Sequence, residues 1–237
     1  QVAVAADGDV FITYEQVNSD SDFNATDTDL SAKTYDIGTN TVSGATTLRT
    51  YPEIANSPLH TSDVAALTDG SFAVMNLYRN EQTVIRINIV ADDGTVTETF
   101  DVDPTPLTLG SGVNQIRQAV IAPLTGGGFV MAFVQKSAAL SNGGISVYGF
   151  DSVPSPFSTI AEPDFTFSVS QVNGGNSSDS TAPAIIGLDD GGFLIAWGEL
   201  VGGRILARRY DEDGVQIGPQ IVVDDTVPED VVGVALD

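Results

Sequence analysis

The stretch that decides the fold runs IIGLDDGGFLIAWGE over residues 185–199: an apolar strand, a turn of Asp and Gly, and a second apolar strand. Similar phrases begin at Val2 (VAVAADGDVFITYE), Val64 (VAALTDGSFAVMN) and Val120 (VIAPLTGGGFVMAFV). The second strands open with Phe residues that are 61, 57 and 64 positions apart, namely Phe11, Phe72, Phe129 and Phe193. This recurrence predicts repeated units that each bury an apolar face against a neighbour.

Each repeat is predicted to form a small antiparallel sheet. The alternation within residues 193–199 places apolar side chains on both faces, which favours a sheet packed between two others. Glycine in the preceding turn supplies the positive φ that tight hairpins need. A third strand is expected at residues 31–36, 84–91, 145–151 and 204–211, and a fourth is clearest at 95–103 and 215–224.

The pattern predicts an all-β fold, a β-propeller of about four repeats of about 60 residues, each a four-stranded antiparallel blade. A β-sandwich uses the same kind of strands but does not explain the regular return of the phrase. The chain is expected to be a single repeat domain, 1–237, with approximate blades at 2–61, 62–118, 119–182 and 183–230.

The last residues, VVGVALD at 231–237, match the first strand of a repeat. They are expected either to pack beside the first blade as a closing strand or to begin a fifth blade. In the second case the chain is a piece of a longer propeller with an open apolar flank, and the open blade edge offers a route to self-association.

The composition is strongly acidic, with 32 Asp and Glu against 9 Lys and Arg and a formal net charge of −23. This disfavours nucleic acids and anionic membrane surfaces as partners, because both are bound through clusters of basic side chains. An acidic surface suits high salt or a calcium-rich exterior, although simple solubility explains it equally well. The chain has no Cys, which excludes disulfides and thiolate chemistry, and no apolar run long enough for membrane insertion.

Calcium is the one cofactor for which the sequence offers ligands. The stretch NSDSDFNATDTD at 18–29 is expected to be a loop, and hard oxygen ligands of the type calcium prefers recur along it: Asp20, Asp22, Asn24, Asp27 and Asp29. It lacks the Gly and Glu of an EF-hand, and a solvated acidic loop is the alternative interpretation. Asp211 and Asp213 form a second candidate, although Asp-Gly turn chemistry explains them more simply.

Catalysis finds little support in the sequence. The chain has a single His, His60, and contains no G-x-S-x-G elbow, P-loop or dinucleotide glycine motif. No catalytic residue is therefore assigned, and the chain is predicted not to be an enzyme. Asp36 and Asp151 are expected to accept backbone N–H bonds at strand ends. Among the basic residues, Arg209 is expected to pair with nearby acids, and Arg204 and Arg208 either to pair at the surface or to bind an acidic sugar.

The fourth repeat carries LDDGGF at 188–193, then Trp197, RYDEDG at 209–214 and IG at 217–218. This combination resembles repeats of very large acidic secreted bacterial proteins, the RTX-like or haemolysin-type calcium-binding surface adhesins. The resemblance implies an extracellular or cell-surface structural, adhesion or assembly module, with other protein modules or surface glycans as partners. The alternative is a glycan-binding lectin or a propeller enzyme acting on glycosides, with carboxylates from different repeats meeting at a central opening.

Overall fold

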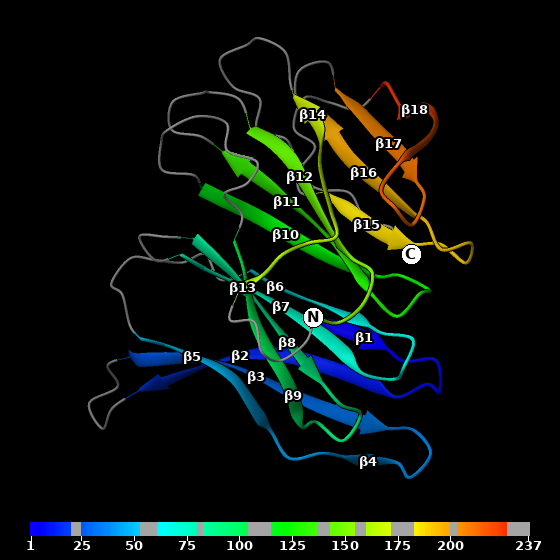
Figure 1. Cartoon of the computed structure of the whole chain (residues 1–237). Helices are drawn as coiled ribbons and strands as arrows, with labels where there is room; N and C mark the ends of the chain where they lie inside the picture. The colour runs from blue at the N-terminus through cyan, green and yellow to red at the C-terminus, as the bar shows by residue number, and fades with distance from the viewer. Residues whose placement is uncertain are drawn as a thin grey trace.

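The computed structural model describes residues 1–19, 25–52, 61–79, 83–103, 115–136, 143–154, 160–171, 183–199 and 203–226. These residues form 18 β-strands and no helix, so none of them makes a helix that could cross a membrane. The strands are grouped in four sheets that follow one another in chain order, from the blue strands at one end of the molecule to the orange strands at the other (Figure 1). The expectation of an all-β chain made of four repeated sheets is confirmed.

Sheets 1 and 2 occupy the N-terminal half of the chain. Sheet 1 consists of β1 (Val2–Val4), β2 (Val10–Ser19), β3 (Ala25–Asp36), β4 (Thr41–Val42) and β5 (Thr46–Pro52). Sheet 2 consists of β6 (Thr61–Ala66), β7 (Phe72–Arg79), β8 (Thr83–Val90) and β9 (Val96–Val102), with β13 (Ile160–Ala161) added along β9. The pairing of β13 with β9 is parallel, and it ties the chain that connects two strands of sheet 3 to the edge of sheet 2.

Sheets 3 and 4 follow. Sheet 3 consists of β10 (Gln115–Pro123), β11 (Phe129–Lys136), β12 (Gly143–Phe150) and β14 (Phe165–Gln171). Sheet 4 consists of β15 (Ala184–Gly187), β16 (Phe193–Glu199), β17 (Arg204–Tyr210) and β18 (Gln216–Asp224). The expected third strands coincide with β3, β8, β12 and β17, and the two expected fourth strands coincide with β9 and β18. β10 begins inside the range expected for the second repeat, and residues 231–237 lie outside the described residues.

The turn that joins the first two strands has the same geometry in every sheet. In sheet 2, the N–H of Leu67 donates to the carbonyl of Ser71 at 2.7 Å and the N–H of Gly70 donates to the carbonyl of Leu67 at 3.2 Å. The same pair of hydrogen bonds recurs in sheets 1, 3 and 4. The turn glycines have φ between +87° and +97°, a range that favours glycine, and they are Gly8, Gly70, Gly127 and Gly191. The hairpin prediction is confirmed.

The geometry of this turn, which is the same in all four sheets, corrects the alignment of the four phrases. Aligning them on their Phe residues places the first phrase one residue out of register with the others. Phe72 lies two residues after its turn glycine, as do the corresponding Phe residues of sheets 3 and 4, but Phe11 lies three residues after Gly8. Val10 therefore occupies the equivalent position in sheet 1. Since side chains alternate between the two faces of a strand, a shift of one residue places Phe11 on the opposite face of its sheet.

The packing of the sheets explains this shift. Phe72 and its counterparts in sheets 3 and 4 each point toward the preceding sheet, whereas Phe11 points toward the following one and stacks on Phe72 with ring centroids 4.6 Å apart. Sheet 3 buries both faces: Met131 packs against sheet 2 and Val130 against sheet 4. The sequence predicted such packing from residues 193–199 of sheet 4, whose apolar side chains pack against sheet 3 on one face. Among the described residues no sheet precedes sheet 1, and its outer face exposes Val2, Val4 and Ile12.

The first strands of successive sheets lie next to one another, β1 beside β6, β6 beside β10 and β10 beside β15. This arrangement is propeller-like, because the first strand of each blade lines the centre of a propeller. Within the described part of the chain, no contact of comparable extent joins β15 back to β1.

Candidate functional site

The acidic stretch at 18–29 is less of a loop than the sequence suggested. β2 continues to Ser19 and β3 begins at Ala25, so Asp27 and Asp29 belong to a strand. The hydroxyl of Thr50, on the neighbouring strand β5, donates to Oδ1 of Asp29 at 2.6 Å. Asp20, Asp22 and Asn24, and the side chain of Asp27, lie outside the described residues.

The second calcium candidate forms a turn. Oδ1 of Asp211 accepts the N–H groups of Asp213 at 3.2 Å and Val215 at 2.7 Å, and it thereby holds the connection between β17 and β18. Asp213 is exposed. Within the described ranges, no three His, Cys, Asp or Glu side chains are grouped so that they could hold a metal ion.

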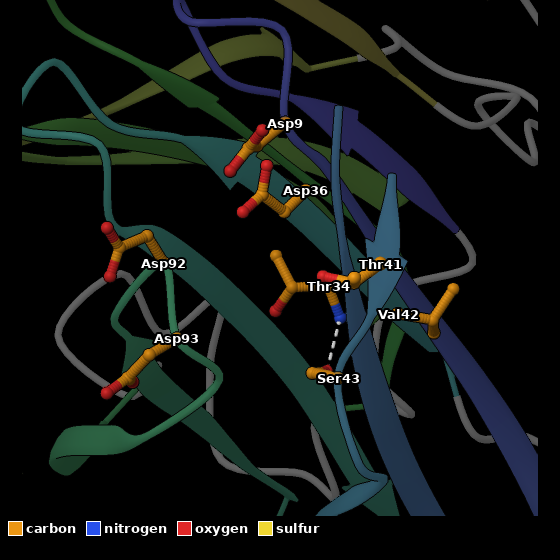
Figure 2. Close-up of a pocket in the computed structure, with 8 residues that line it drawn as sticks. All are labelled: Asp9, Thr34, Asp36, Thr41, Val42, Ser43, Asp92 and Asp93. Atoms are coloured by element: carbon orange, nitrogen blue, oxygen red, sulfur yellow. Dashed lines mark hydrogen bonds between the residues drawn. The ribbon is translucent and has the colours of Figure 1, made fainter. Parts of the chain in front are cut away.

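An acidic pocket that the sequence did not predict lies where sheet 1 meets the β8–β9 turn of sheet 2 (Figure 2). Its volume is about 280 Å³, and it is lined by Asp9, Thr34, Asp36, Thr41, Val42, Ser43, Asp92 and Asp93. Asp9 comes from the β1–β2 turn and Asp36 from the end of β3, whereas Asp92 and Asp93 come from the turn of the next sheet. The carboxylates are separated by up to about 80 positions in the sequence, so only the packing of the two sheets brings them together.

Backbone hydrogen bonds fix three of these carboxylates. Oδ1 of Asp9 accepts the N–H of Ile37 at 3.0 Å, and Oδ1 of Asp36 accepts the N–H of Thr39 at 2.9 Å, as the sequence predicted for Asp36. Oδ1 of Asp93 accepts the N–H of Thr95 at 2.8 Å.

The same local hydrogen bonds favour the charged form of two of these groups. Hydrogen bonds from Thr39 lower the pKa of Asp36, and those from Thr95 lower the pKa of Asp93. Both carboxyl groups are therefore ionised at neutral pH, which makes the pocket anionic.

Thr34 is the buried polar group of this pocket. It is 3% exposed, its N–H donates to Oγ of Ser43 at 2.9 Å, and its own hydroxyl is buried without a hydrogen-bond partner. In Figure 2 this side chain points from β3 into the space in front of Asp92 and Asp93. A hydroxyl in this state is costly, because a buried polar group normally finds a partner.

Gly94 lies close to that hydroxyl, on the β8–β9 turn of sheet 2. A Cβ atom added to Gly94 would lie 3.6 Å from Oγ1 of Thr34 and 3.6 Å from Oγ1 of Thr46. The hydroxyl of Thr46 donates to the carbonyl of Gly94 at 3.0 Å, so the turn of sheet 2 is fastened to sheet 1 beside the pocket. The sequence gave no signal that the turn at Asp93 and Gly94 faces Thr34.

A second pocket of about 400 Å³ lies beside the first, and Asp92 lines both. It is formed between the turns of sheet 2 and Val153, and its other acidic residues are Asp69 and Glu98. The hydroxyl of Ser71 lowers the pKa of Asp69, so this pocket is also anionic at neutral pH.

Asp63 is a partly buried carboxyl group that the sequence did not single out. It belongs to β6, and its Oδ2 accepts the N–H of Ile121 from β10 at 2.9 Å. Burial raises the pKa of Asp63, and the hydrogen bond from Ile121 opposes that effect. The carboxylate joins the inner strands of sheets 2 and 3, which is a structural role.

The arginine residues of sheet 4 are engaged in packing. Arg209 pairs with Asp190, as expected, and Arg204 begins β17. Arg208 donates to Oε1 of Gln220 at 2.6 Å and to the carbonyl of Val169 at 2.8 Å. Its guanidinium lies 5.6 Å from the centroid of the Trp197 ring. These contacts occupy Arg208 and leave the acidic-sugar interpretation without support there.

Asp151 differs from the expectation that its carboxylate caps a strand end. Its backbone N–H is the donor, and the acceptor is Oδ2 of Asp164 at 2.8 Å. Burial and the negative charges of Asp164 and Asp213 raise the pKa of Asp151. His60, the remaining candidate for catalysis, lies outside the described residues.

No family model matches the chain, and a search among curated proteins finds no match. Two solved structures are similar to it in general arrangement. A protein of unknown function from Bacteroides caccae has 15% sequence identity and a TM-score of 0.36 over 99% of this chain and 62% of that one. Prolyl oligopeptidase B from Galerina marginata has 9% identity and a TM-score of 0.36 over 93% of this chain and 34% of that one. The chain thus spans less than two thirds of the length of either structure, and neither likeness extends to function.

Proposed function

We propose that this chain is a non-catalytic structural, adhesion or assembly module of an extracellular bacterial surface protein, built as blades of a β-propeller. The observation that carries the proposal is the outer face of sheet 1. In sheets 2 to 4 the corresponding face is buried against the preceding sheet, but in sheet 1 it is open, with Val2 and Val4 each 59% exposed and Ile12 39% exposed. Lys33 and Tyr35 lie on the same face, so the three aliphatic side chains have a polar surrounding. Exposed aliphatic side chains with polar residues around them are a surface for association with another protein module.

Self-association of the chain tests this role, because a second molecule of the same protein presents the same exposed face for contact. Sedimentation velocity over a concentration series should reveal oligomers that increase with salt, because salt screens the repulsion between chains of net charge −23. Val4→Lys places a charge in the exposed face and should abolish the oligomers. Val215→Lys, at an equally exposed valine in a turn of sheet 4, should leave them unchanged. A wild-type chain that stays monomeric in high salt at about 0.1 mM contradicts assembly through this face.

The acidic pocket supports a non-catalytic role. Glycoside hydrolysis needs one carboxyl group that keeps its proton near neutral pH. Hydrogen bonding instead lowers the pKa of Asp36 and of Asp93. The pocket therefore favours binding of a positively charged group over acid catalysis.

Calcium remains the proposed stabilising cofactor, with ligands in the stretch at 18–29. Thermal melting with and without millimolar calcium tests this, because a ligand that binds only the folded chain raises the melting temperature. Asp20→Asn combined with Asp22→Asn should remove the calcium-dependent increase. Asp211→Asn should retain it, since an asparagine oxygen still accepts the turn hydrogen bonds. No increase at saturating calcium contradicts the proposed cofactor.

A further inference from the structure

We propose that the acidic pocket between sheets 1 and 2 binds the cationic head of a basic side chain, the guanidinium of arginine or the ammonium of lysine, presented by a partner protein. The inference rests on the proposed role as an adhesion or assembly module, because it takes the ligand from a partner. It names a second contact, separate from the apolar face of sheet 1.

The first argument for binding of a cationic group is the negative charge of the pocket. Four carboxylates from two sheets surround it, namely Asp9, Asp36, Asp92 and Asp93, and no Lys or Arg is among its lining residues. No ion pair joins any of the four to a basic side chain in the described ranges. A concave surface lined by charges of one sign attracts a ligand of the opposite sign.

The second step concerns the size of the cation. Calcium needs six to eight oxygen ligands at about 2.3–2.6 Å around one point. The described carboxylates are not grouped in this way, and the pocket has a volume of about 280 Å³. A guanidinium or ammonium group suits this spacing better, since it has several N–H donors that reach separate acceptors.

The unpartnered hydroxyl of Thr34 is the third and independent observation. It is 97% buried, it points into the pocket, and its Oγ1 has no hydrogen-bond partner. An N–H donor of the ligand would satisfy that oxygen while the neighbouring carboxylates balance the charge.

The pocket rim also suits the stem of a basic side chain. Val42 is 60% exposed and lines the pocket beside Thr41. The methylene groups of arginine and lysine commonly pack along such apolar atoms while the charged head is held by polar groups. The positions of Asp36 and Asp93 are fixed by backbone hydrogen bonds, so little reorganisation is needed when the ligand enters.

Titration with capped single residues, followed by the backbone amide NMR signals, tests the proposal. The probes are N-acetyl-arginine amide and N-acetyl-lysine amide, and the control is N-acetyl-citrulline amide, which has the shape of arginine without its charge. At low salt, at least one basic probe should shift the amides of Thr34, Ser43 and Gly94 with a dissociation constant of about 1 mM. Equal shifts with the citrulline probe would overturn the proposal, as would no shift with either basic probe.

Variants separate this site from the general negative charge of the chain. Asp36→Asn with Asp93→Asn keeps acceptors for both backbone bonds, and it should weaken binding about tenfold. Asp189→Asn with Asp225→Asn removes the same charge from exposed positions in and after sheet 4, and it should leave binding unchanged. Equal weakening in both variants would show non-specific attraction and overturn the site.

The variant Thr34→Val distinguishes a binding role of the Thr34 hydroxyl from a purely structural one. Valine has nearly the shape of threonine and removes the unpartnered hydroxyl, so the variant should melt at the same or a higher temperature while it binds the basic probe more weakly. Unchanged probe binding in Thr34→Val would contradict the role given to this hydroxyl and overturn the proposal.

Two further results distinguish the pocket from its alternatives. If millimolar calcium shifts the same amides and prevents the basic probe from binding, the pocket is a metal site and the proposal is wrong. Val4→Lys, which tests the apolar face of sheet 1, should leave probe binding intact. Loss of self-association and loss of probe binding are therefore separate outcomes, and failure of one proposal is distinguishable from failure of the other.

Discussion

Sheets 1 and 4 contain hairpin turns of the same geometry. The strand that follows the turn nevertheless buries opposite faces in the two sheets. In sheet 4 the residue two places after the turn glycine, Phe193, is fully buried against sheet 3. In sheet 1 the equivalent residue is Val10, which is only partly buried, and the next residue, Phe11, is fully buried against sheet 2. The position of a sheet in the stack, and not its turn, decides which face receives the aromatic side chain.

The comparison has a consequence for function. Sheet 3 has a neighbour on each side and buries both faces, whereas among the described residues sheet 1 has a neighbouring sheet on one side only. Phe11 lies on the covered face, and the other face keeps Val2, Val4 and Ile12 exposed, with Lys33 and Tyr35 beside them. Exposed aliphatic side chains grouped on one sheet face are typical of a surface that another protein covers.

The largest expected loss of stability comes from substitutions on the buried face of β2, compared with substitutions on its other face. Phe11→Ala and Phe72→Ala should each lower the free energy of unfolding by about 3–5 kcal/mol, because both side chains are fully buried at one interface. Val10→Ala should cost less than about 1 kcal/mol, since this side chain is only partly buried and no described sheet lies against it. Urea denaturation measures all three. A cost for Val10→Ala as large as that for Phe11→Ala would contradict the assignment of the faces.

The next effect compares two equivalent positions immediately before the turn. A Cβ atom added to Gly187 in sheet 4 would lie 2.1 Å from the carbonyl oxygen of Pro123 in sheet 3. Gly187→Ala should therefore destabilise the chain by about 1–3 kcal/mol through overpacking. Val4 holds the same position in sheet 1, and Val4→Ala should change stability by no more than about 0.5 kcal/mol. Guanidinium denaturation measures the stability of both variants. Similar losses of stability in the two variants would contradict the difference in packing between sheets 1 and 4.

A pH-dependent effect is expected at the contact between sheets 2 and 3. Burial raises the pKa of Asp63 above its ordinary value of 3.8, so the folded chain binds this proton more tightly than the unfolded chain does. The contribution of Asp63 to the free energy of unfolding is therefore largest below 3.8 and falls as the pH rises through the raised pKa.

Asp63→Asn should remove this pH dependence while an amide oxygen still accepts the N–H of Ile121. The stability of the wild type relative to this variant should fall as the pH rises above 3.8, which urea denaturation at several pH values measures. A relative stability that rises over this range would show that the pKa is lowered instead.

The smallest expected effect concerns the turn that the sheets share. Oδ1 of Asp7 accepts the N–H of Asp9 at 3.0 Å, and Oδ1 of Asp69 accepts the N–H of Ser71 at 2.9 Å. Asp7→Ala should cost about 0.5–1 kcal/mol, the usual contribution of one such hydrogen bond. Asp69→Ala should cost more, because Oδ1 of Asp69 also accepts the hydroxyl of Ser71 at 2.6 Å. Thermal melting measures both, and a larger cost for Asp7→Ala than for Asp69→Ala would contradict this account of the turns.

Much of the fold follows from local pattern. The turn glycines, the alternation along the strands and the positions of β8, β12 and β17 were all predictable, because hairpins and strands depend on residues close in sequence. The phase of Phe11 was not, since a strand with apolar residues on both faces does not show which face has a neighbour. The stretch at 18–29 was predicted as a loop from its polar composition, although pairing with β2 extends β3 back to Ala25 and pairing with β5 covers residues 27–29.

The candidate site was less predictable than the fold. Asp36 was expected to bond a backbone N–H, and it does, but nothing in the sequence placed it beside Asp93 of the next sheet. Thr34 carried no signal at all, because whether a hydroxyl is buried without a partner depends on the residues packed around it. Asp63 likewise became distinctive only when Ile121 of another sheet was placed against it.

The sequence by itself determined that the chain is all-β, that its strands form hairpins through glycine turns, and that four similar sheets follow one another. These features depend on residues within a few positions of each other, so the local pattern carries them. Only the tertiary structure decided which face of each sheet is buried, which apolar face remains open, and which turns meet to form the acidic pocket. Those features depend on contacts between residues far apart in the chain, and the stacking of the sheets is what brings such residues together.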